Sequence, residues 1–398
     1  MTEHSTTCDA TALDRLLDGQ LNDAARVALE SHLEGCAACC ARLEESAAAP
    51  AEWVAARQSL SSIDELPVQD GLDQSQAGDA GRFGEGDVPR AEHIRSFLTA
   101  TDDPRMLGRF GGYEIAGIIG CGGMGIVLKG LDVALNRFVA IKVLAPHLAT
   151  SAAARTRFAR EARAAAAVVH ENVIAIHAVS EANGLPYLVM PYDRGSSLQR
   201  RIDSQGPLSA LEVLRIGRQV AAGLAAAHAQ GLVHRDIKPA NILLEDGVER
   251  LTITDFGLAR AADDASLTRS GVIAGTPQFM SPEQARGEAI DRRSDLFSLG
   301  SVLYALCTGR SPFRAESPYG VLRRITDDHP RPIRELNPEI PEWLAAIIGR
   351  LHAKLPGDRF ASADEVADLL QQCLAHVQQP DLVPLPADWQ FPQAIRFS

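Results

Sequence analysis

The chain has few cysteines, few aromatic residues and no long apolar stretch. Its 398 residues include 7 cysteines and only 5% aromatic side chains. An odd cysteine count, with four of them in the first forty positions, argues against a secreted disulfide framework and is more typical of a metal site. There is no apolar run of about eighteen residues and no charged-then-apolar N-terminal segment. We therefore expect a cytoplasmic protein without a membrane span or secretory signal.

Basic residues are also too few to give the chain a net positive charge. Lys and Arg total 39 against 51 Asp and Glu, which gives a formal net charge of -12. Nucleic acids and anionic membranes attract basic surfaces, so we expect no nucleic-acid partner. With 46% hydrophobic and 23% charged residues, the chain can bury at least one large core.

Composition divides the chain into four parts. Residues 1–48 contain cysteines and leucines at broadly helical spacing, which predicts a small helical module. Residues 49–108 are rich in Gly, Asp, Ser, Gln and Pro, which predicts a flexible linker. Residues 109–376 change from short apolar strands to long helices and form the large domain, and residues 377–398 form a Pro-containing tail.

The most informative stretch of the large domain reads HRDIKPAN, at residues 234–241. It places a carboxylate, an ammonium group and an amide at close spacing. This stretch resembles the catalytic loop of protein kinases. The resemblance implies that Asp236 accepts the proton of an incoming hydroxyl and that Lys238 neutralises charge on the moving phosphoryl group. It also implies that Asn241 holds a Mg²⁺ ion that bridges the ATP phosphates.

A glycine-rich segment and a lysine-containing strand precede this loop. Alone, the segment GCGGMG at residues 120–125 is equally typical of a surface hairpin. The strand at 139–144 sets Lys142 in an apolar run, where an unpaired ammonium group would be costly to bury. The kinase resemblance supplies its partners, the ATP α/β-phosphates and Glu161 on the next helix, although a lone Glu on an Ala-rich helix is often a surface residue. The residues that it implies around the nucleotide are Gly120, Cys121, Gly122, Gly123, Met124, Gly125, Val127 and Ala140.

Further residues would complete the ATP site. Asp255 follows a β-branched strand and would chelate Mg²⁺ or Mn²⁺ with Asn241, because oxygen ligands suit hard cations. An Asp before Gly is also a common turn residue. By resemblance, the adenine lies against Met190 as gatekeeper, and the backbone groups of Pro191 and Asp193 form its hydrogen-bonding edge. Pro191 departs from the usual acidic residue but retains the carbonyl that is used.

These motifs occur in the order found in protein kinases, and GxGGMG resembles the bacterial, eukaryotic-like Ser/Thr kinases. The resemblance implies an α+β fold with a small β-rich N-lobe and a helical C-lobe. It implies transfer of the ATP γ-phosphate to Ser or Thr hydroxyls of protein substrates, with Thr276 bridging Asp236 and Lys238. Related kinases also form homodimers through the N-lobe and phosphorylate in trans.

Other features concern regulation and stability. Arg235, beside Asp236, is typical of kinases whose activation segment is ordered by phosphorylation. Thr268 and Ser270 are the candidate phosphorylation sites, although hydroxyls are common in polar loops. Asp295, and Arg359 paired with Glu283, resemble the buried charges that brace the C-lobe. Ser281 stands where Ala is more usual.

The N-terminal module has the spacing His32-x3-Cys36-x2-Cys39. On a helix these three side chains share one face and suit tetrahedral Zn²⁺. Cys8 could complete the site from upstream and ranks above Cys40, which would point about 100° away from Cys39 if the helix continues. Free thiols packed against leucines are the alternative, and Gly35 could bend such a helix. The segment resembles the zinc-binding anti-sigma family, which implies a regulatory module that binds a protein partner.

Three other functions fit parts of the sequence. The kinase domain could be a pseudokinase scaffold, although Lys142, Asp236, Asn241 and Asp255 are all present. The zinc module could be the main function, as an anti-sigma-like binding protein. A small-molecule kinase of the same fold is a third alternative, although the segment at residues 275–283 favours a peptide acceptor.

Overall fold

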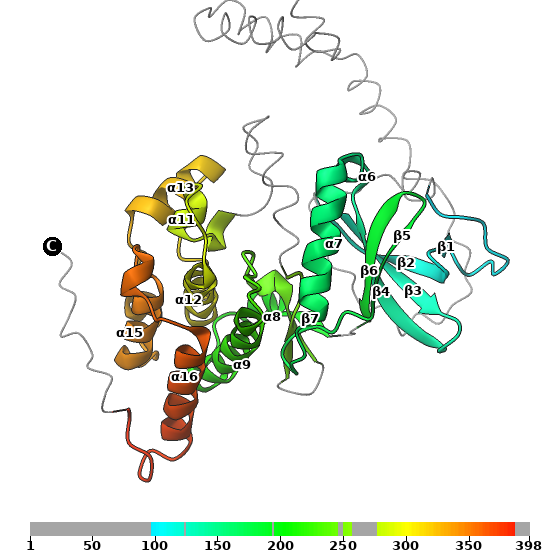
Figure 1. The fold of residues 1–398 in the computed structure, drawn as a ribbon. Coiled ribbons are helices and arrows are strands. Elements are labelled where there is room, and N and C mark those ends of the chain that lie inside the picture. Colours follow the sequence, from blue (N-terminus) through cyan, green and yellow to red (C-terminus); the bar gives the residue numbers. More distant parts are fainter. Residues whose placement is uncertain (1–96, 123–124, 193–194, 246–249, 257–276, 387–398) are drawn as a thin grey trace, which may run out of the picture. The chain divides into compact units, whose positions relative to one another are not determined.

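The structure is a computed structural model that describes residues 97–122, 125–192, 195–245, 250–256 and 277–386. They form a β-rich N-lobe followed by a mostly helical C-lobe (Figure 1). This confirms the two-lobed α+β fold expected from the kinase motifs. The predicted zinc module at 1–48 and most of the predicted linker lie outside the described residues.

One antiparallel sheet builds the N-lobe. Its strands are β1 (Gly108–Phe110), β2 (Tyr113–Gly122), β3 (Gly125–Asp132), β4 (Arg137–Leu144), β5 (Ala178–Ala182) and β6 (Leu185–Pro191). Among the described residues it is a six-stranded sheet in the order β1-β2-β3-β4-β6-β5. The interior strands β4 and β6 are buried from Val139 to Leu144 and from Leu185 to Met190, and Lys142 is the one charged residue in these two stretches.

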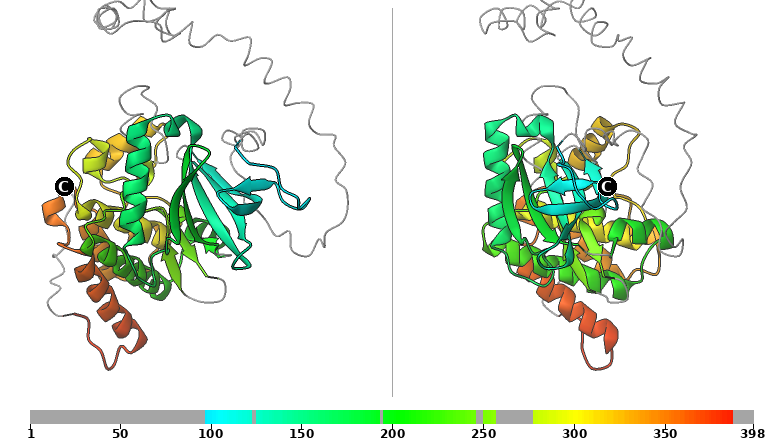
Figure 2. Two further views of the ribbon diagram at one scale, coloured as in Figure 1. Left: turned by 45° about the vertical axis from the view of Figure 1, so that its right-hand side comes forward. Right: turned by 90° about the vertical axis from the view of Figure 1, so that its right-hand side faces the viewer.

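A long helix, α7 (Ala152–Ala166), follows the short α6 (Pro146–Ala149) and lies beside the sheet, in contact with β5 and β6 (Figures 1 and 2). The Ser151 hydroxyl caps its start by accepting a hydrogen bond from the Ala154 amide at 3.3 Å. Phe158 and Ala162, one turn apart, are buried in the N-lobe core. This packing fixes the helix that carries Glu161.

Residues before β1, which composition assigns to the linker, pack on the N-lobe. The rings of Phe97 and Phe110 meet edge to face with centroids 5.7 Å apart, and Phe110 meets Tyr187 in the same way at 5.2 Å. The Asn183 side chain donates a hydrogen bond to the Phe97 carbonyl at 2.8 Å. Since the partners are far along the chain, local composition could not reveal this docking.

Helices dominate the C-lobe. They are α8 (Leu198–Gln205), α9 (Ala210–Ala229), α11 (Pro282–Ala285), α12 (Arg292–Thr308), α13 (Pro318–Asp327), α14 (Ile333–Leu336), α15 (Glu342–Leu351) and α16 (Ala363–Gln378). Every residue of α12 from Ser294 onward is buried, so this helix forms the centre of the lobe, and α9 contacts both α12 and α16. Among the described residues, no helix has the length and apolar character that a membrane span requires.

A small sheet and short helices complete the C-lobe. The strands β7 (Ser196–Ser197), β8 (Ile242–Leu244) and β9 (Leu251–Ile253) pair in that order. Three 3-10 turns are η1 (Pro239–Asn241), η2 (Pro277–Phe279) and η3 (Pro356–Asp358). The catalytic-loop stretch lies between α9 and β8, and Asp255 follows β9. Asn241 directly precedes β8, and Asp255 lies two residues after β9. Because Ile242 pairs with Ile253, both candidate metal-binding residues lie at the same end of the small sheet.

Candidate active site

The glycine-rich segment forms the hairpin between β2 and β3. Its paired residues, toward the tip, are Gly120 with Val127, Cys121 with Ile126, and Gly122 with Gly125. Gly125 is required, because a Cβ atom there would lie 2.0 Å from the carbonyl oxygen of Val143. Gly123 and Met124, at the tip, lie outside the described residues.

Three of the predicted nucleotide residues share one face of the N-lobe sheet. Val127 lies directly opposite Lys142 across β3 and β4, and Ala140 is two residues from Lys142 on the same strand. Directly paired residues, and residues two apart, point to the same side of a sheet. Ala140 is also paired with Met190 on β6, which places the predicted gatekeeper beside this face.

Lys142 makes an ion pair with Asp255. Its Nζ lies 2.9 Å from Oδ1 of Asp255, and the lysine side chain is only 9% exposed. Asp255 has a φ of 65°, in the left-handed region that residues other than glycine rarely adopt. Such strained residues cluster at functional sites. The predicted contact of Lys142 with Glu161 on α7 stays a prediction.

The environment of Asp255 lowers its pKa. Burial of the carboxyl group acts to raise the pKa, but the charge and hydrogen bond of Lys142, together with the charge of Lys238, outweigh it. The pKa of Asp255 therefore lies below its ordinary value. An ionised oxygen ligand at this position suits a hard divalent cation.

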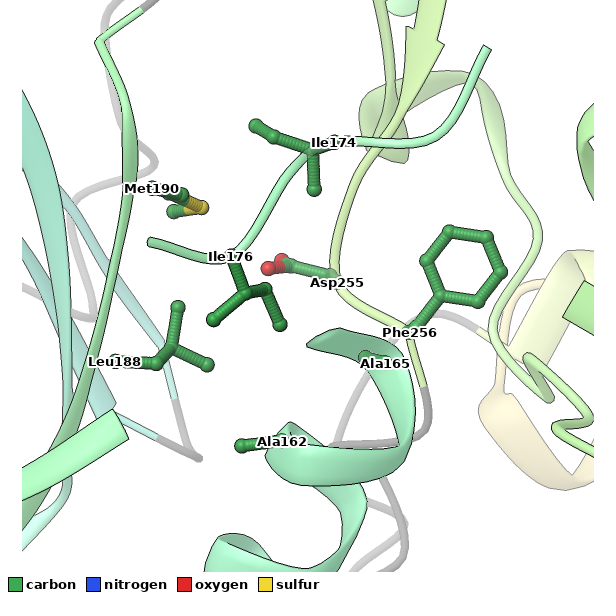
Figure 3. Close-up of a pocket in the computed structure, with 8 residues that line it drawn as sticks. All are labelled: Ala162, Ala165, Ile174, Ile176, Leu188, Met190, Asp255 and Phe256. Carbon is green, nitrogen blue, oxygen red and sulfur yellow. The ribbon is translucent and has the colours of Figure 1, made fainter. Parts of the chain in front are cut away.

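An apolar pocket lies between α7, β6 and the segment that carries Asp255 (Figure 3). The Asp255 carboxylate points toward the side chains that line this pocket, while the ring of Phe256 turns away from it (Figure 3). The lining residues are Ala162, Ala165, Ile174, Ile176, Leu188, Met190, Asp255 and Phe256. The predicted gatekeeper Met190 and the predicted metal ligand Asp255 thus border the same pocket.

The side chains of Lys238 and Asn241 converge on Asp236 in the catalytic loop. Lys238 Nζ donates to Oδ2 of Asp236 at 2.8 Å. The Asn241 amide nitrogen donates to the same Oδ2 at 3.0 Å and to the Asp236 main-chain carbonyl at 2.8 Å. Because Nδ2 is engaged in this way, the amide oxygen of Asn241 is the atom that can bind a cation.

The His234 side chain connects the catalytic loop to the segment that carries Asp255. Its Nε2 donates to the carbonyl of Thr254 at 2.8 Å, and its Nδ1 accepts the Asp236 amide hydrogen at 3.2 Å. A carbonyl can only accept and an amide N–H can only donate, so these partners fix the ring with its hydrogen on Nε2. The His234 ring also contacts Phe256, with centroids 4.5 Å apart. The loop and the Asp255 segment are therefore linked through one imidazole.

Asp295 on α12 holds the backbone of the catalytic loop. Its carboxylate accepts the main-chain N–H groups of His234 at 2.8 Å and Arg235 at 2.7 Å. It also accepts a hydrogen bond from His228 Nε2, at the end of α9, at 2.8 Å. Asp295 is fully buried. The sequence identified Asp295 but not His228, whose only local signal is a basic residue in the last turn of a helix.

Glu283 and Arg359 form the buried ion pair that the sequence predicted. Two guanidinium nitrogens lie 2.7 and 2.8 Å from the two carboxylate oxygens, and both residues are 3% exposed. The Arg359 guanidinium also donates to the main-chain carbonyls of Ala353, Arg293 and Lys354. All five of its N–H groups therefore have acceptors, which is the condition for burying an arginine at low cost.

Several predicted residues lie outside the described part of the chain. They are Cys8, His32, Cys36 and Cys39 of the zinc module, and Gly123, Met124, Asp193, Thr268, Ser270 and Thr276 of the kinase domain. Their roles stay predictions.

Two family models match separate parts of the chain. Residues 113–380 match the family described as "Protein kinase domain", and residues 11–40 match the family described as "Putative zinc-finger". The second match includes His32, Cys36 and Cys39 but begins after Cys8. It agrees with the resemblance to a zinc-binding family that the His/Cys spacing suggested.

Relatives and solved structures agree with the kinase match. Serine/threonine-protein kinase PknB of Mycobacterium leprae is 38% identical over 278 residues, which cover 68% of this chain and 44% of the relative. PknB of Mycolicibacterium smegmatis is 39% identical over 266 residues, covering 65% and 42%. The chain thus spans less than half the length of these relatives.

The crystal structure of the Mycobacterium tuberculosis PknI kinase domain is similar, with a TM-score of 0.53 and 29% identity. The matched region covers 66% of this chain and 97% of the PknI kinase domain. The matched kinase segment makes up more than half of the chain and has the residue geometry described above. The chain therefore belongs to the protein kinase domain family.

Proposed function

We propose that this chain transfers the γ-phosphate of ATP to serine and threonine hydroxyls of proteins. The observation that supports this most directly is the contact of both Lys238 and Asn241 with one carboxylate oxygen of Asp236. The Thr254 main-chain N–H donates to the Asn241 carbonyl at 2.9 Å, so the loop and the segment with the Lys142–Asp255 pair lie next to each other. The similar proteins named as Ser/Thr kinases support the same reaction.

The described residues divide the work of phosphoryl transfer. Asp236 orients the acceptor hydroxyl and takes its proton, using Oδ1, while Oδ2 is held by Lys238 and Asn241. Lys238 stabilises negative charge on the transferred group. Lys142 positions the α/β-phosphates, and its burial beside a carboxylate shows that the site holds opposite charges close together.

The residues present fit ATP with a divalent cation. The oxygens of Asn241 and Asp255 are the hard ligands that Mg²⁺ or Mn²⁺ prefers. When bound, the cation neutralises phosphate charge. Gly120, Cys121 and Gly122 would lie over the phosphates with the rest of the hairpin, because glycine lets the backbone approach closely. Adenine would lie beside Met190, with the carbonyl of Pro191 and the backbone of Asp193 as its hydrogen-bonding edge.

We propose that the phosphate acceptors are Ser and Thr hydroxyls, on the basis of residues in and near the catalytic loop. Lys238 is the form that Ser/Thr kinases carry at this position, and Thr276 would bridge Asp236 and Lys238. Thr268 and Ser270 are the proposed autophosphorylation sites, and a phosphate there would be bound by Arg235 in bidentate fashion. Autophosphorylation in trans would require a homodimer.

Labelled phosphate transfer tests this function. The full chain with Mg²⁺, γ-labelled ATP and myelin basic protein as a generic acceptor should yield phosphoserine and phosphothreonine. Lys142→Met, which removes the phosphate-positioning charge, should lower kcat/KM for ATP by about a hundredfold or more. Bound ATP without transfer by the wild type would favour the pseudokinase scaffold instead. Label on a small molecule only, or on tyrosine, would contradict the assigned acceptor.

We also propose that residues 1–48 form a Zn²⁺-binding module that regulates the kinase through a protein partner. Its support is the His/Cys spacing together with the zinc-finger match at 11–40. Within the described residues no group of three or more His, Cys, Asp or Glu side chains could hold a metal ion. Zinc in the purified protein would therefore point to residues outside the described ranges, where Cys8, His32, Cys36 and Cys39 are the proposed ligands.

The zinc content of the purified protein tests the proposed N-terminal module. Purified wild-type protein should contain about one equivalent of Zn²⁺, as expected for one four-ligand site. The His32→Ala/Cys36→Ser variant should lose it because imidazole and thiolate ligands are removed. A Cys373→Ser variant, which changes a buried C-lobe thiol, should keep its zinc. Native protein that contains no zinc would contradict the module.

A further inference from the structure

The residue before the catalytic Asp236 has a costly backbone conformation. Arg235 has a φ of 68°, in the left-handed region that side chains other than glycine rarely adopt. A residue keeps such a conformation only when its surroundings hold it there. Because Arg235 and Asp236 share a peptide bond, whatever holds the carbonyl of Arg235 also fixes the plane from which the Asp236 side chain projects.

Two side chains hold the two backbone polar groups of Arg235. Its N–H donates to Oδ1 of Asp295 at 2.7 Å. Its carbonyl accepts a hydrogen bond from Nε2 of Gln284 at 2.7 Å. Asp295 lies on α12 and Gln284 on α11, so two separate helices fix the same peptide segment.

The opposite end of the Gln284 amide is fixed as well. Its Oε1 accepts the main-chain N–H of Ser281 at 3.0 Å and the Ser281 hydroxyl at 3.1 Å. Ser281 in turn caps the first turn of α11, which completes a reciprocal capping box. An N–H can only donate and a carbonyl can only accept, so these partners leave one orientation for the amide, with Nε2 toward Arg235.

We propose that Gln284 is a positioning residue for phosphoryl transfer, which holds the Arg235 carbonyl and thereby the orientation of Asp236. The proposal rests on the proposed kinase function. It also gives a role to Ser281, which stands where the resemblance leads us to expect Ala. The capping box ties the start of α11, within the segment predicted to support the peptide, to the residue beside Asp236. Misplacement of a reacting group by a small distance is enough to slow catalysis strongly.

Three variants separate positioning from helix capping. Gln284→Met keeps the size of the side chain but removes all three of the side-chain hydrogen bonds described above. Ser281→Ala removes the hydroxyl cap but leaves the Gln284 contact with Arg235. Gln199→Met is the matched control, because Gln199 on α8 bonds only to the exposed Asp203, at 2.9 Å, in the described structure.

Steady-state kinetics of the full chain with ATP and myelin basic protein should separate the effect of each variant on kcat from its effect on KM. We expect Gln284→Met to lower kcat by about tenfold or more, with KM for ATP changed less than about twofold. Gln199→Met should keep kcat within about twofold of the wild type, and Ser281→Ala should lose less kcat than Gln284→Met, because it keeps the Gln284 contact with the Arg235 carbonyl. Wild-type kcat in Gln284→Met would overturn the proposal.

Gln284→Glu covers the case in which Gln284→Met does not fold. An ionised carboxylate still accepts hydrogen bonds from Ser281, but it cannot donate to the Arg235 carbonyl. Its kcat at neutral pH, where an ordinary carboxyl is ionised, should therefore fall by about tenfold or more. Wild-type kcat in Gln284→Glu would count against the proposal.

Hydrogen exchange tests whether Gln284 holds the catalytic loop, independently of any measurement of activity. If the wild type transfers no phosphate, the proposed function fails, but the contact can still be measured. Amides at residues 234–238 should exchange faster in Gln284→Met than in Gln199→Met, because the segment loses one of its two anchors. Equal exchange in the two variants would overturn the positioning role whatever the activity.

Discussion

Replacing Asp236 by asparagine is expected to lower kcat by about a thousandfold while leaving ATP binding nearly unchanged. Asparagine keeps the shape of the side chain but cannot take a proton from the acceptor hydroxyl. The lost interaction belongs to the transition state, so the ground-state complex with ATP should keep its Kd. Phosphate transfer at saturating substrate and calorimetric titration with ATP measure the two quantities separately.

The matched control is Asp203→Asn on α8. Asp203 is an exposed carboxylate that accepts a hydrogen bond from Gln199. This variant should keep wild-type kcat. If Asp236→Asn also kept it, Asp236 would have no part in the reaction. If Asp236→Asn lost ATP binding together with activity, the site would have been disrupted and the role of proton acceptor would be unsupported.

Arg359→Ala is expected to lower the free energy of unfolding by about 3–5 kcal/mol. The reason is the Glu283 carboxylate, which would stay buried without its cation. Ser294 would still donate to Glu283 at 2.6 Å, but one hydroxyl cannot neutralise the charge. Urea unfolding of wild type and variant measures the difference.

Arg323→Ala is the control for this prediction. Arg323 forms a 3.8 Å ion pair with Asp327, and its side chain is 76% exposed. Surface pairs of this kind contribute less than about 1 kcal/mol, so the variant should unfold almost as the wild type does. A loss as small as this in Arg359→Ala would show that the buried pair does not brace the C-lobe.

The pH dependence of the Arg359→Ala effect has a definite sign. Burial acts to raise the pKa of Glu283, but the hydrogen bonds from Arg359 and Ser294 outweigh it and hold the pKa below its ordinary value. The group therefore contributes stability above the unfolded-state pKa of about 4.3, and this contribution is lost as pH falls through the lower folded-state pKa. The difference in stability between wild type and Arg359→Ala should shrink over that acidic range.

The sequence predicted the residues of the site better than the contacts among them. Asp236, Lys238 and Asn241 lie within eight residues of chain, so their convergence follows from one loop. Their support does not, because Asp295 reaches the loop from across the C-lobe core. The kinase resemblance supplied Asp295 as a buried brace, but no local pattern indicates that its carboxylate holds two backbone amides.

Gln284 is a second residue whose long-range contact could not be predicted from the sequence. The spacing of Ser281 and Gln284 fits a capping box, and reading it would have predicted the start of α11. The second contact of Gln284, with the Arg235 carbonyl, joins residues 49 positions apart. Only the packing of α11 against the catalytic loop creates it, so neither propensity nor spacing could predict it.

The docking of Phe97 also bears on where the folding unit begins. The kinase family match starts at Tyr113, after β1 and after the aromatic contacts of Phe97 and Phe110. A fragment cut at Tyr113 would leave β2 with an unpaired outer edge and uncover the ring of Tyr187. Unpaired strand edges pair readily with strands of other molecules. A fragment that begins at the boundary given by similarity would therefore be more prone to self-association, and the packed N-lobe includes residues from at least Phe97 onward.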